Sequence, residues 1–104
     1  MEINIIDASL DKFIYSLEKP TIAKVLRVID LLEKFGYNLG LPHSKKVLAQ
    51  FYELRIRGAQ EVRLFYTFHK SRIFLLHGFI KKSQKIPRRE IILALKKARQ
   101  LDSA

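Results

Sequence analysis

Basic side chains gather in two short stretches of the second half of the chain, and both have the chemistry to hold a polyanion. Six residues make up the two stretches: Arg55, Arg57, Arg63, Lys81, Lys82 and Lys85. A guanidinium fork matches two oxygens of one phosphate, and an ammonium group stabilises charge that develops on a phosphate oxygen. The two stretches are therefore candidates for binding a phosphate backbone. For the arginines, the alternative is an exposed strand whose charges only keep the protein soluble. For the lysines, the alternative is a basic loop that only adds affinity for a nucleic-acid backbone.

The net charge of +10 is unevenly distributed along the 104 residues. Residues 1–42 carry five basic and six acidic groups, whereas residues 43–104 carry fifteen basic and four acidic groups, a net charge of +11. An excess confined to one part of a chain indicates a polyanion partner, with nucleic acid as the first candidate. The alternative is a basic protein whose charged face is simply solvated.

Judged by side-chain chemistry alone, His77 is the strongest single candidate for proton transfer, because an imidazole exchanges protons near neutral pH. It lies in the apolar stretch RIFLLHGFI, so a hydrogen-bonded core histidine is an equally good interpretation. The chain has no cysteine, no HExxH spacing, no P-loop and no GxSxG motif. We therefore expect neither a metal site nor a cofactor. Few carboxylates accompany the basic residues, which disfavours a paired-carboxylate mechanism.

Residues 8–36 are predicted to form a helical hairpin. Asp7 or Ser9 caps the first helix, and Pro20 suits the first turn of the second, which ends at Gly36. Apolar residues fall at helical spacing in the first helix: Leu10, Phe13, Ile14 and Leu17. The second stripe consists of Ile22, Val25, Leu26, Ile29, Leu32 and Phe35. Residues 2–6 are expected to form a short strand before the hairpin.

From residue 51 onward the apolar period changes from 3.6 to 2, which predicts strands. Alternation in residues 51–57 places Glu53, Arg55 and Arg57 on one face, opposite Tyr52, Leu54 and Ile56. Residues 62–68 and 72–80 form two further strands, and short connections predict an antiparallel meander. Residues 36–46 have the composition of a turn. A last helix follows Pro87, with an apolar stripe of Ile91, Leu95, Ala98 and Leu101.

This order of elements predicts a small single α+β domain over residues 1–104. It consists of an N-terminal helical hairpin, an antiparallel sheet and a C-terminal helix, with the helices covering one sheet face and the arginines on the other. The N-terminal stretch does not have the pattern of a signal peptide, and no apolar run reaches the ~18 residues of a membrane span. We therefore expect a cytoplasmic protein that does not enter a membrane.

Two long stretches, FYELRIRGAQEVRLFYTF and IFLLHGFIKKSQKIPRREIILALKKAR, resemble the RelE/HigB group of type II toxins. The branch that they resemble most is the one described as phage-derived Gp49-like proteins, and the resemblance covers nearly the whole chain. It implies a RelE-like fold and a toxin that blocks translation by cutting mRNA at the ribosome. It also implies a cognate antitoxin, often a helix-turn-helix protein encoded by the adjacent gene.

The resemblance carries over to only some of the site residues. Arg55, Arg63 and Lys82 match or lie near basic positions of the RelE active site. Glu53 stands where RelE has a lysine, and no tyrosine follows Lys85. The general acid and base therefore stay open, with a lysine such as Lys82 ranked ahead of His77. Three further residues are expected to bind RNA: Arg57, Lys81 and Lys85.

Two other functions remain compatible with these residues. Toxins of the ParE type share the fold and poison DNA gyrase without cutting RNA. A plain RNA-binding module uses the same basic face to hold a backbone without cleaving it.

Overall fold

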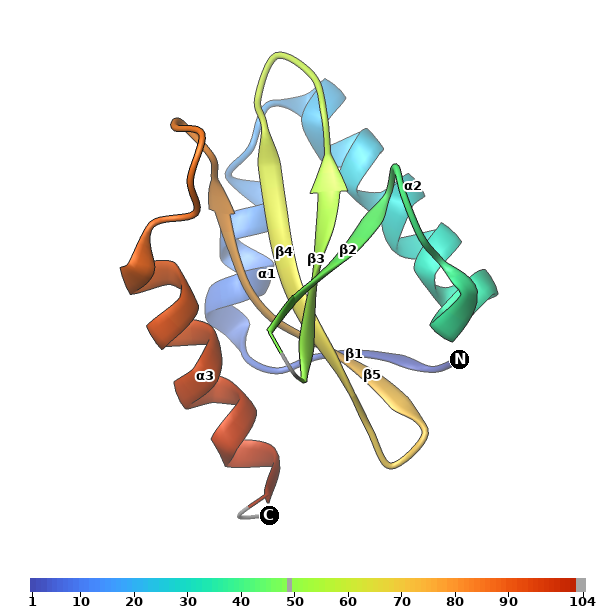
Figure 1. Cartoon of the computed structure of the whole chain (residues 1–104). Coiled ribbons are helices and arrows are strands. Elements are labelled where there is room, and N and C mark those ends of the chain that lie inside the picture. The colour runs from blue at the N-terminus through green and yellow to red at the C-terminus, as the bar shows by residue number, and fades with distance from the viewer. Residues whose placement is uncertain (49, 103–104) are drawn as a thin grey trace.

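A five-stranded mixed sheet separates one helix from the other two (Figure 1). The computed structural model describes residues 1–48 and 50–102. The strands are β1 (Ile3–Ile5), β2 (Ser44–Leu48), β3 (Phe51–Ile56), β4 (Val62–His69) and β5 (Arg72–Ile80), in the spatial order β1-β5-β4-β3-β2. The helices are α1 (Ala8–Tyr15), α2 (Lys19–Phe35) and α3 (Arg88–Asp102), and a short 3-10 helix, η1 (Gly36–Asn38), follows α2. The predicted α+β class is confirmed.

Strands β2 to β5 form the predicted antiparallel meander. The turn between β4 and β5 is only two residues long, and Lys70 and Ser71 both have positive φ angles, of 50° and 64°. Two successive positive φ angles let a two-residue turn follow the right-handed twist of the strands that it joins.

The sheet differs from the prediction in two respects. Strand β1 pairs parallel to β5, with Ile3 beside Ile73, so the sheet is mixed rather than purely antiparallel. Strand β2 begins inside the stretch that was predicted to be a turn and pairs with β3. Two exposed lysines, Lys45 and Lys46, obscure the apolar alternation of β2, as is common in edge strands.

The helical hairpin is confirmed, and four of the six residues in the predicted stripe of α2 pack in the core: Ile22, Val25, Ile29 and Leu32. The buried residues of the helix are Thr21, Val25, Val28 and Leu32. Leu26 and Phe35 are instead 42% and 46% exposed. Apolar side chains cover more than one face of this helix, so two overlapping stripes fit the helical period. Packing of α2 against β3 selects the one that is buried.

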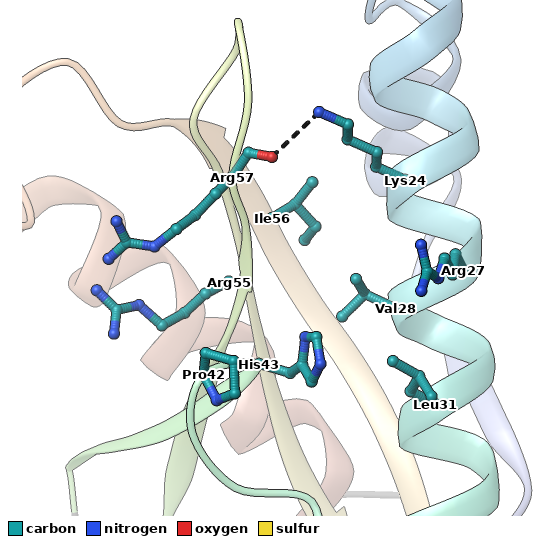
Figure 2. Close-up of a pocket in the computed structure, with 9 residues that line it drawn as sticks. All are labelled: Lys24, Arg27, Val28, Leu31, Pro42, His43, Arg55, Ile56 and Arg57. Carbon is teal, nitrogen blue, oxygen red and sulfur yellow. Dashed lines mark hydrogen bonds between the residues drawn. The ribbon is translucent and has the colours of Figure 1, made fainter.

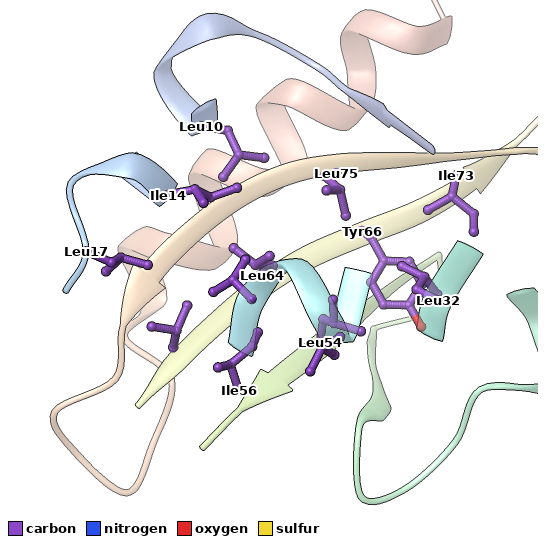
Figure 3. Close-up of a cluster of buried hydrophobic side chains, with 13 residues drawn as sticks. Leu10, Ile14, Leu17, Leu32, Leu54, Ile56, Leu64, Tyr66, Ile73 and Leu75 are labelled. Carbon is purple, nitrogen blue, oxygen red and sulfur yellow. The ribbon is translucent and has the colours of Figure 1, made fainter. Parts of the chain in front are cut away.

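The larger core lies between the sheet and the pair α1 and α2 (Figure 3). Leu10 and Ile14 of α1 meet strand residues such as Leu64 and Leu75 there. Gly78 of β5 makes the approach of α1 possible, because a Cβ at that position would lie 2.8 Å from Phe13 Cε2 of this helix. The same core contains Tyr66, whose hydroxyl is hydrogen-bonded to Ser44 Oγ and whose pKa is raised by burial.

A second core lies on the opposite face of the sheet, under α3. Phe51, Phe65, Leu76 and Phe79 form its strand side, and Ala94 is buried on the helix side. The predicted stripe of α3 packs against this core. Helices therefore cover both faces, and the expectation of one uncovered face is wrong. The arginines lie on the α3 face of the sheet, at the end near the β3–β4 turn and the loop that leads into α3.

Asp7 ties the start of α1 to α3. Its Oδ1 accepts hydrogen bonds from the backbone N–H groups of Ser9 and Leu10 and from Ser9 Oγ, the last at 2.7 Å. Lys97 Nζ of α3 lies 3.2 Å from Asp7 Oδ2. The hydrogen bond from the Ser9 side chain, helped by Lys97 and the Leu10 backbone, holds the pKa of Asp7 below its usual value.

This lowered pKa predicts an acid-dependent loss of stability. A carboxylate with a lower pKa in the folded chain stabilises it fully above the unfolded pKa, and the effect disappears as the pH falls through the folded pKa. We expect Asp7→Ala to lower the free energy of unfolding by about 1–2 kcal/mol near neutral pH. The difference from the parent should begin to shrink near pH 3.8, the usual value for an aspartate, and should vanish only below the lower pKa of the folded chain.

Urea unfolding near neutral pH and at a pH below that lower pKa measures this difference. Asp11→Ala is the matched control, because Asp11 is exposed in the first turn of the same helix and caps nothing. An equal loss for Asp7→Ala at both pH values would contradict the prediction.

Candidate functional site

Strands β3 and β4 bring Arg55 and Arg63 directly opposite each other on the face that α3 covers further along the sheet. Arg57 follows the end of β3 and is exposed. The strand register brings Arg63 beside Arg55, because residues paired across strands have Cβ atoms about 5 Å apart. Arg57 lines the same surface cleft as these two residues. Figure 2 shows the side chains of Arg55 and Arg57 extending together from β3, away from α2.

The loop after β5 lies beside the same arginines. Its first residue, Lys81, donates a backbone hydrogen bond of 2.7 Å to the carbonyl of Glu61, next to the β3–β4 turn. This bond anchors the loop where the strands bearing the arginines are joined. An open cleft of about 530 Å³ results, which we name the basic cleft. Its lining residues are Arg55, Arg57, Glu61, Arg63, Lys81, Lys82, Ser83 and Gln84.

Arg63 lies at the base of this cleft and is not free to bind an anion. Its side chain is 2% exposed, its Nε lies 3.3 Å from Glu53 Oε2, and its Nη1 lies 3.2 Å from Glu61 Oε2. The same Nη1 donates to the carbonyl of Val62 at 3.1 Å. Glu53, the departure from the RelE pattern, is thus the buried partner of Arg63.

The other cations of the cleft lack such partners. Within residues 1–48 and 50–102, no carboxylate lies within 4.0 Å of the charged groups of Arg55, Arg57, Lys81 or Lys82. The Nε of Arg55 is also buried without a hydrogen-bond acceptor among these residues. Four unpaired cations around one concave surface attract an anion strongly, because their charges add and the low-dielectric protein beneath them focuses the field.

His77 lies elsewhere on the sheet. A bulge in the β4–β5 pairing turns both Leu76 and His77 toward α3. There His77 Nε2 and Glu90 Oε1 are 2.7 Å apart, and the two side chains are only 16% and 12% exposed. Lys81 lies four positions after His77, or roughly 13 Å further along at 3.3 Å per residue. The structure therefore makes His77 a link between β5 and the start of α3 rather than a wall of the basic cleft.

Lys85 is exposed but lies outside the lining of the cleft. Its carbonyl accepts a 2.8 Å hydrogen bond from Ser83 Oγ, which helps to shape the loop. Sequence reasoning missed three lining residues: Glu61, Ser83 and Gln84. Glu61 is the only carboxylate among the described residues that line the cleft. The sequence does not reveal this role of Glu61, because the cleft forms only where the 81–87 loop lies beside the β3–β4 turn.

Within residues 1–48 and 50–102, no group of three or more histidine, aspartate or glutamate side chains is placed to hold a metal ion. None of the helices in this part of the chain has the length and apolarity needed to cross a bilayer.

Comparison with known families places this geometry in context. The family described as phage derived protein Gp49-like (DUF891) matches residues 12–99, which include both cationic stretches. The chain belongs to this family. It is a family of RelE/HigB-like toxins, so membership indicates the toxin of a toxin–antitoxin pair and implies an antitoxin partner. A search of the curated proteins found no match.

The unpaired cations predict the salt dependence of RNA binding. Arg57→Ala and Lys82→Ala should each weaken binding of a single-stranded RNA and reduce the slope of log K against log salt by roughly 0.7, as expected for one lost phosphate contact. Fluorescence anisotropy at several salt concentrations measures both quantities. Lys12→Ala, an exposed lysine of α1, is the control and should leave the slope unchanged. Unaltered slopes in both cleft variants would rule out phosphate contacts there.

Arg63 should behave differently from its neighbours, because its removal leaves Glu53 buried without a counter-charge. We expect Arg63→Ala to lower the free energy of unfolding by about 3–5 kcal/mol. Arg57→Ala, at an exposed position, should change it by less than about 0.5 kcal/mol. Urea unfolding of the two variants beside the parent provides the comparison. A fully stable Arg63→Ala protein would show that the buried ion pairs do not hold β3 and β4 together.

Proposed function

We propose that the protein is the toxin of a type II toxin–antitoxin system and that it cuts mRNA at the ribosome without a metal ion. One observation carries the proposal: four cations without acidic partners surround a concave surface that also contains a carboxylate. Family membership supports the toxin role. The partners proposed with it are mRNA, the ribosome and an antitoxin encoded by the adjacent gene.

The proposed reaction is attack of a ribose 2′-oxygen on the adjacent phosphorus. A new P–O2′ bond forms as the P–O5′ bond breaks, which leaves a 2′,3′-cyclic phosphate on one fragment and a 5′-hydroxyl on the other. Water is not consumed in this step. The reaction requires in-line geometry, neutralisation of the phosphate, and transfer of one proton from the 2′-hydroxyl and another to the 5′-oxygen.

The residues of the basic cleft divide these tasks. Arg55 and Arg57 hold phosphate oxygens from the side of β3, while Lys82 faces the scissile phosphate from the loop and gives a proton to the departing 5′-oxygen. Glu61 accepts the proton of the 2′-hydroxyl. Its Oε2 lies 3.2 Å from Arg63 Nη1, so Arg63 acts as a positioning residue that orients this carboxylate.

A second candidate is a toxin of the same fold that inhibits its target without cutting RNA. The basic cleft has few side chains that can transfer a proton, which favours this candidate. His77 contacts Glu90 outside the cleft, and Glu61 already forms an ion pair with Arg63. A gyrase-directed toxin should cause DNA damage and filamentation before protein synthesis falls, whereas an mRNA-cutting toxin should stop protein synthesis first. Pulse labelling after induction separates the two.

Glu61→Gln tests the proposed division of tasks most sharply. The amide cannot accept the 2′-hydroxyl proton, so cleavage of ribosome-bound mRNA should slow by about 10²–10⁴-fold. RNA affinity should stay equal or rise, because a negative charge has left the cleft. Induced expression of the parent should arrest bacterial growth, and expression of the variant should not.

Two results would count against this assignment. Cleavage by Glu61→Gln at the parent rate would mean that another group accepts the proton. A parallel loss of cleavage and RNA affinity would mean that Glu61 shapes the cleft rather than taking part in chemistry. Glu18→Gln is the matched control, since Glu18 is an exposed glutamate at the start of α2.

A further inference from the structure

A second cleft lies on the other side of β3, between this strand and α2 (Figure 2). Its volume is about 310 Å³, near the lower end for ligand pockets and enough for one or two apolar side chains. Val28 and Leu31 of α2 face Ile56 of β3 across it, and His43 closes one end (Figure 2). We name it the α2–β3 cleft.

The floor of the α2–β3 cleft is apolar, and the apolar surface continues at its rim. Val28 and Ile56 are almost fully buried, and Leu31 is half-buried between the helix and the opening. Pro42 lines the same cleft, and the preceding residue, Leu41, is 69% exposed. An apolar recess with an exposed apolar neighbour is typical of a surface that another protein covers.

The charged groups at this opening are all basic. Lys24 and Arg27 project from α2, and in the described part of the chain neither has a carboxylate within 4.0 Å of its charged group. Lys24 Nζ reaches across to the carbonyl of Arg57 at 3.3 Å, so it already spans the cleft at one end (Figure 2). No acidic residue is among the described residues that line the cleft. The recess is therefore complementary to a segment with an apolar anchor flanked by carboxylates.

We propose that an acidic, amphipathic helix of the antitoxin docks in the α2–β3 cleft. Its apolar side chains occupy the recess over Val28 and Leu31, and its carboxylates pair with Lys24 and Arg27. Anchoring by apolar side chains at helical spacing is a common mode by which a helix binds a groove. This inference rests on the toxin assignment, but it does not require that the toxin cuts RNA.

RNA fits the α2–β3 cleft less well than a protein helix does. Single-stranded nucleic acid is usually held by aromatic platforms on which bases stack, whereas the ring of His43 is the only one that this recess offers among its described residues. The cations stand at the rim, while the floor contains aliphatic side chains. A phosphate over that floor would lose water without gaining partners.

The two clefts share strand β3, and this links antitoxin binding to RNA binding. Arg55 and Arg57 line both clefts, but their side chains point toward the basic cleft (Figure 2). A helix docked in the α2–β3 cleft lies beside the end of β3, where its carboxylates attract Arg57, the more exposed of the two. The docked helix is therefore expected to weaken RNA binding without filling the basic cleft itself.

Two fluorescent probes test the proposal on the full chain. The first is a synthetic helical peptide with leucines at positions i, i+4 and i+7 and glutamates beside them, and the second is a single-stranded RNA. Arg27→Glu and Leu31→Asp should each weaken the peptide about tenfold or more and leave RNA affinity within about twofold. Lys82→Ala should weaken RNA binding and leave the affinity for the peptide unchanged. Arg57→Ala should weaken both probes.

Lys34→Glu is the matched control, because it makes the same change of charge on exposed α2 surface outside the cleft. It should leave peptide affinity within about twofold of the parent. Three results would overturn the proposal: no saturable peptide binding, equal weakening by Lys34→Glu and Arg27→Glu, or loss of RNA but not peptide in Arg27→Glu. Because only binding is measured, failure here differs from failure of the cleavage test on Glu61→Gln.

Discussion

The buried guanidinium of Arg63 is the interaction on which the basic end of the sheet depends. It lies between Glu53 of β3 and Glu61 beside the turn, within 3.3 Å of both, and it is almost inaccessible to water. The two carboxylates of this region are thereby engaged by a cation that belongs to the protein itself. Four cations of the basic cleft consequently have no carboxylate partner among the described residues: Arg55, Arg57, Lys81 and Lys82. The same contacts hold β3 and β4 in the register that places Arg55 opposite Arg63.

The two layers of helices give each face of β3 a separate role. On the side of α3, the loop after β5 meets the arginines and forms the basic cleft, while the bond between His77 and Glu90 holds the start of α3 against the sheet. On the side of α2, the strand forms one wall of an apolar recess with a basic rim. A toxin must act on its target and also be neutralised by its antitoxin. In the arrangement that we propose, two clefts on one strand allow both events to influence the same arginines.

Much of the architecture follows from the sequence, because hydrophobic period and turn residues determine it locally. The helical hairpin, the alternation along β3 and the stripe of α3 were all predictable on this basis. The parallel pairing of β1, the strand at Ser44–Leu48 and the burial of both sheet faces were not, because each depends on contacts between distant segments. For the site, residue types identified the cations, but only the fold shows that Glu53 and Glu61 engage Arg63, that His77 faces α3, and that Glu61 lines the cleft.

The chemistry of the RNA ends produced after induction tests the central claim most directly. Total RNA from cells that express the toxin can be sequenced by a ligation method that captures only 5′-hydroxyl ends, with the Lys82→Ala variant as a parallel sample. The account predicts new 5′-hydroxyl ends within coding regions, matched by upstream fragments that end in 2′,3′-cyclic phosphate, and their loss in the variant. Growth arrest without new ends, or new ends bearing 5′-phosphates, would contradict metal-independent attack by the 2′-oxygen in the basic cleft.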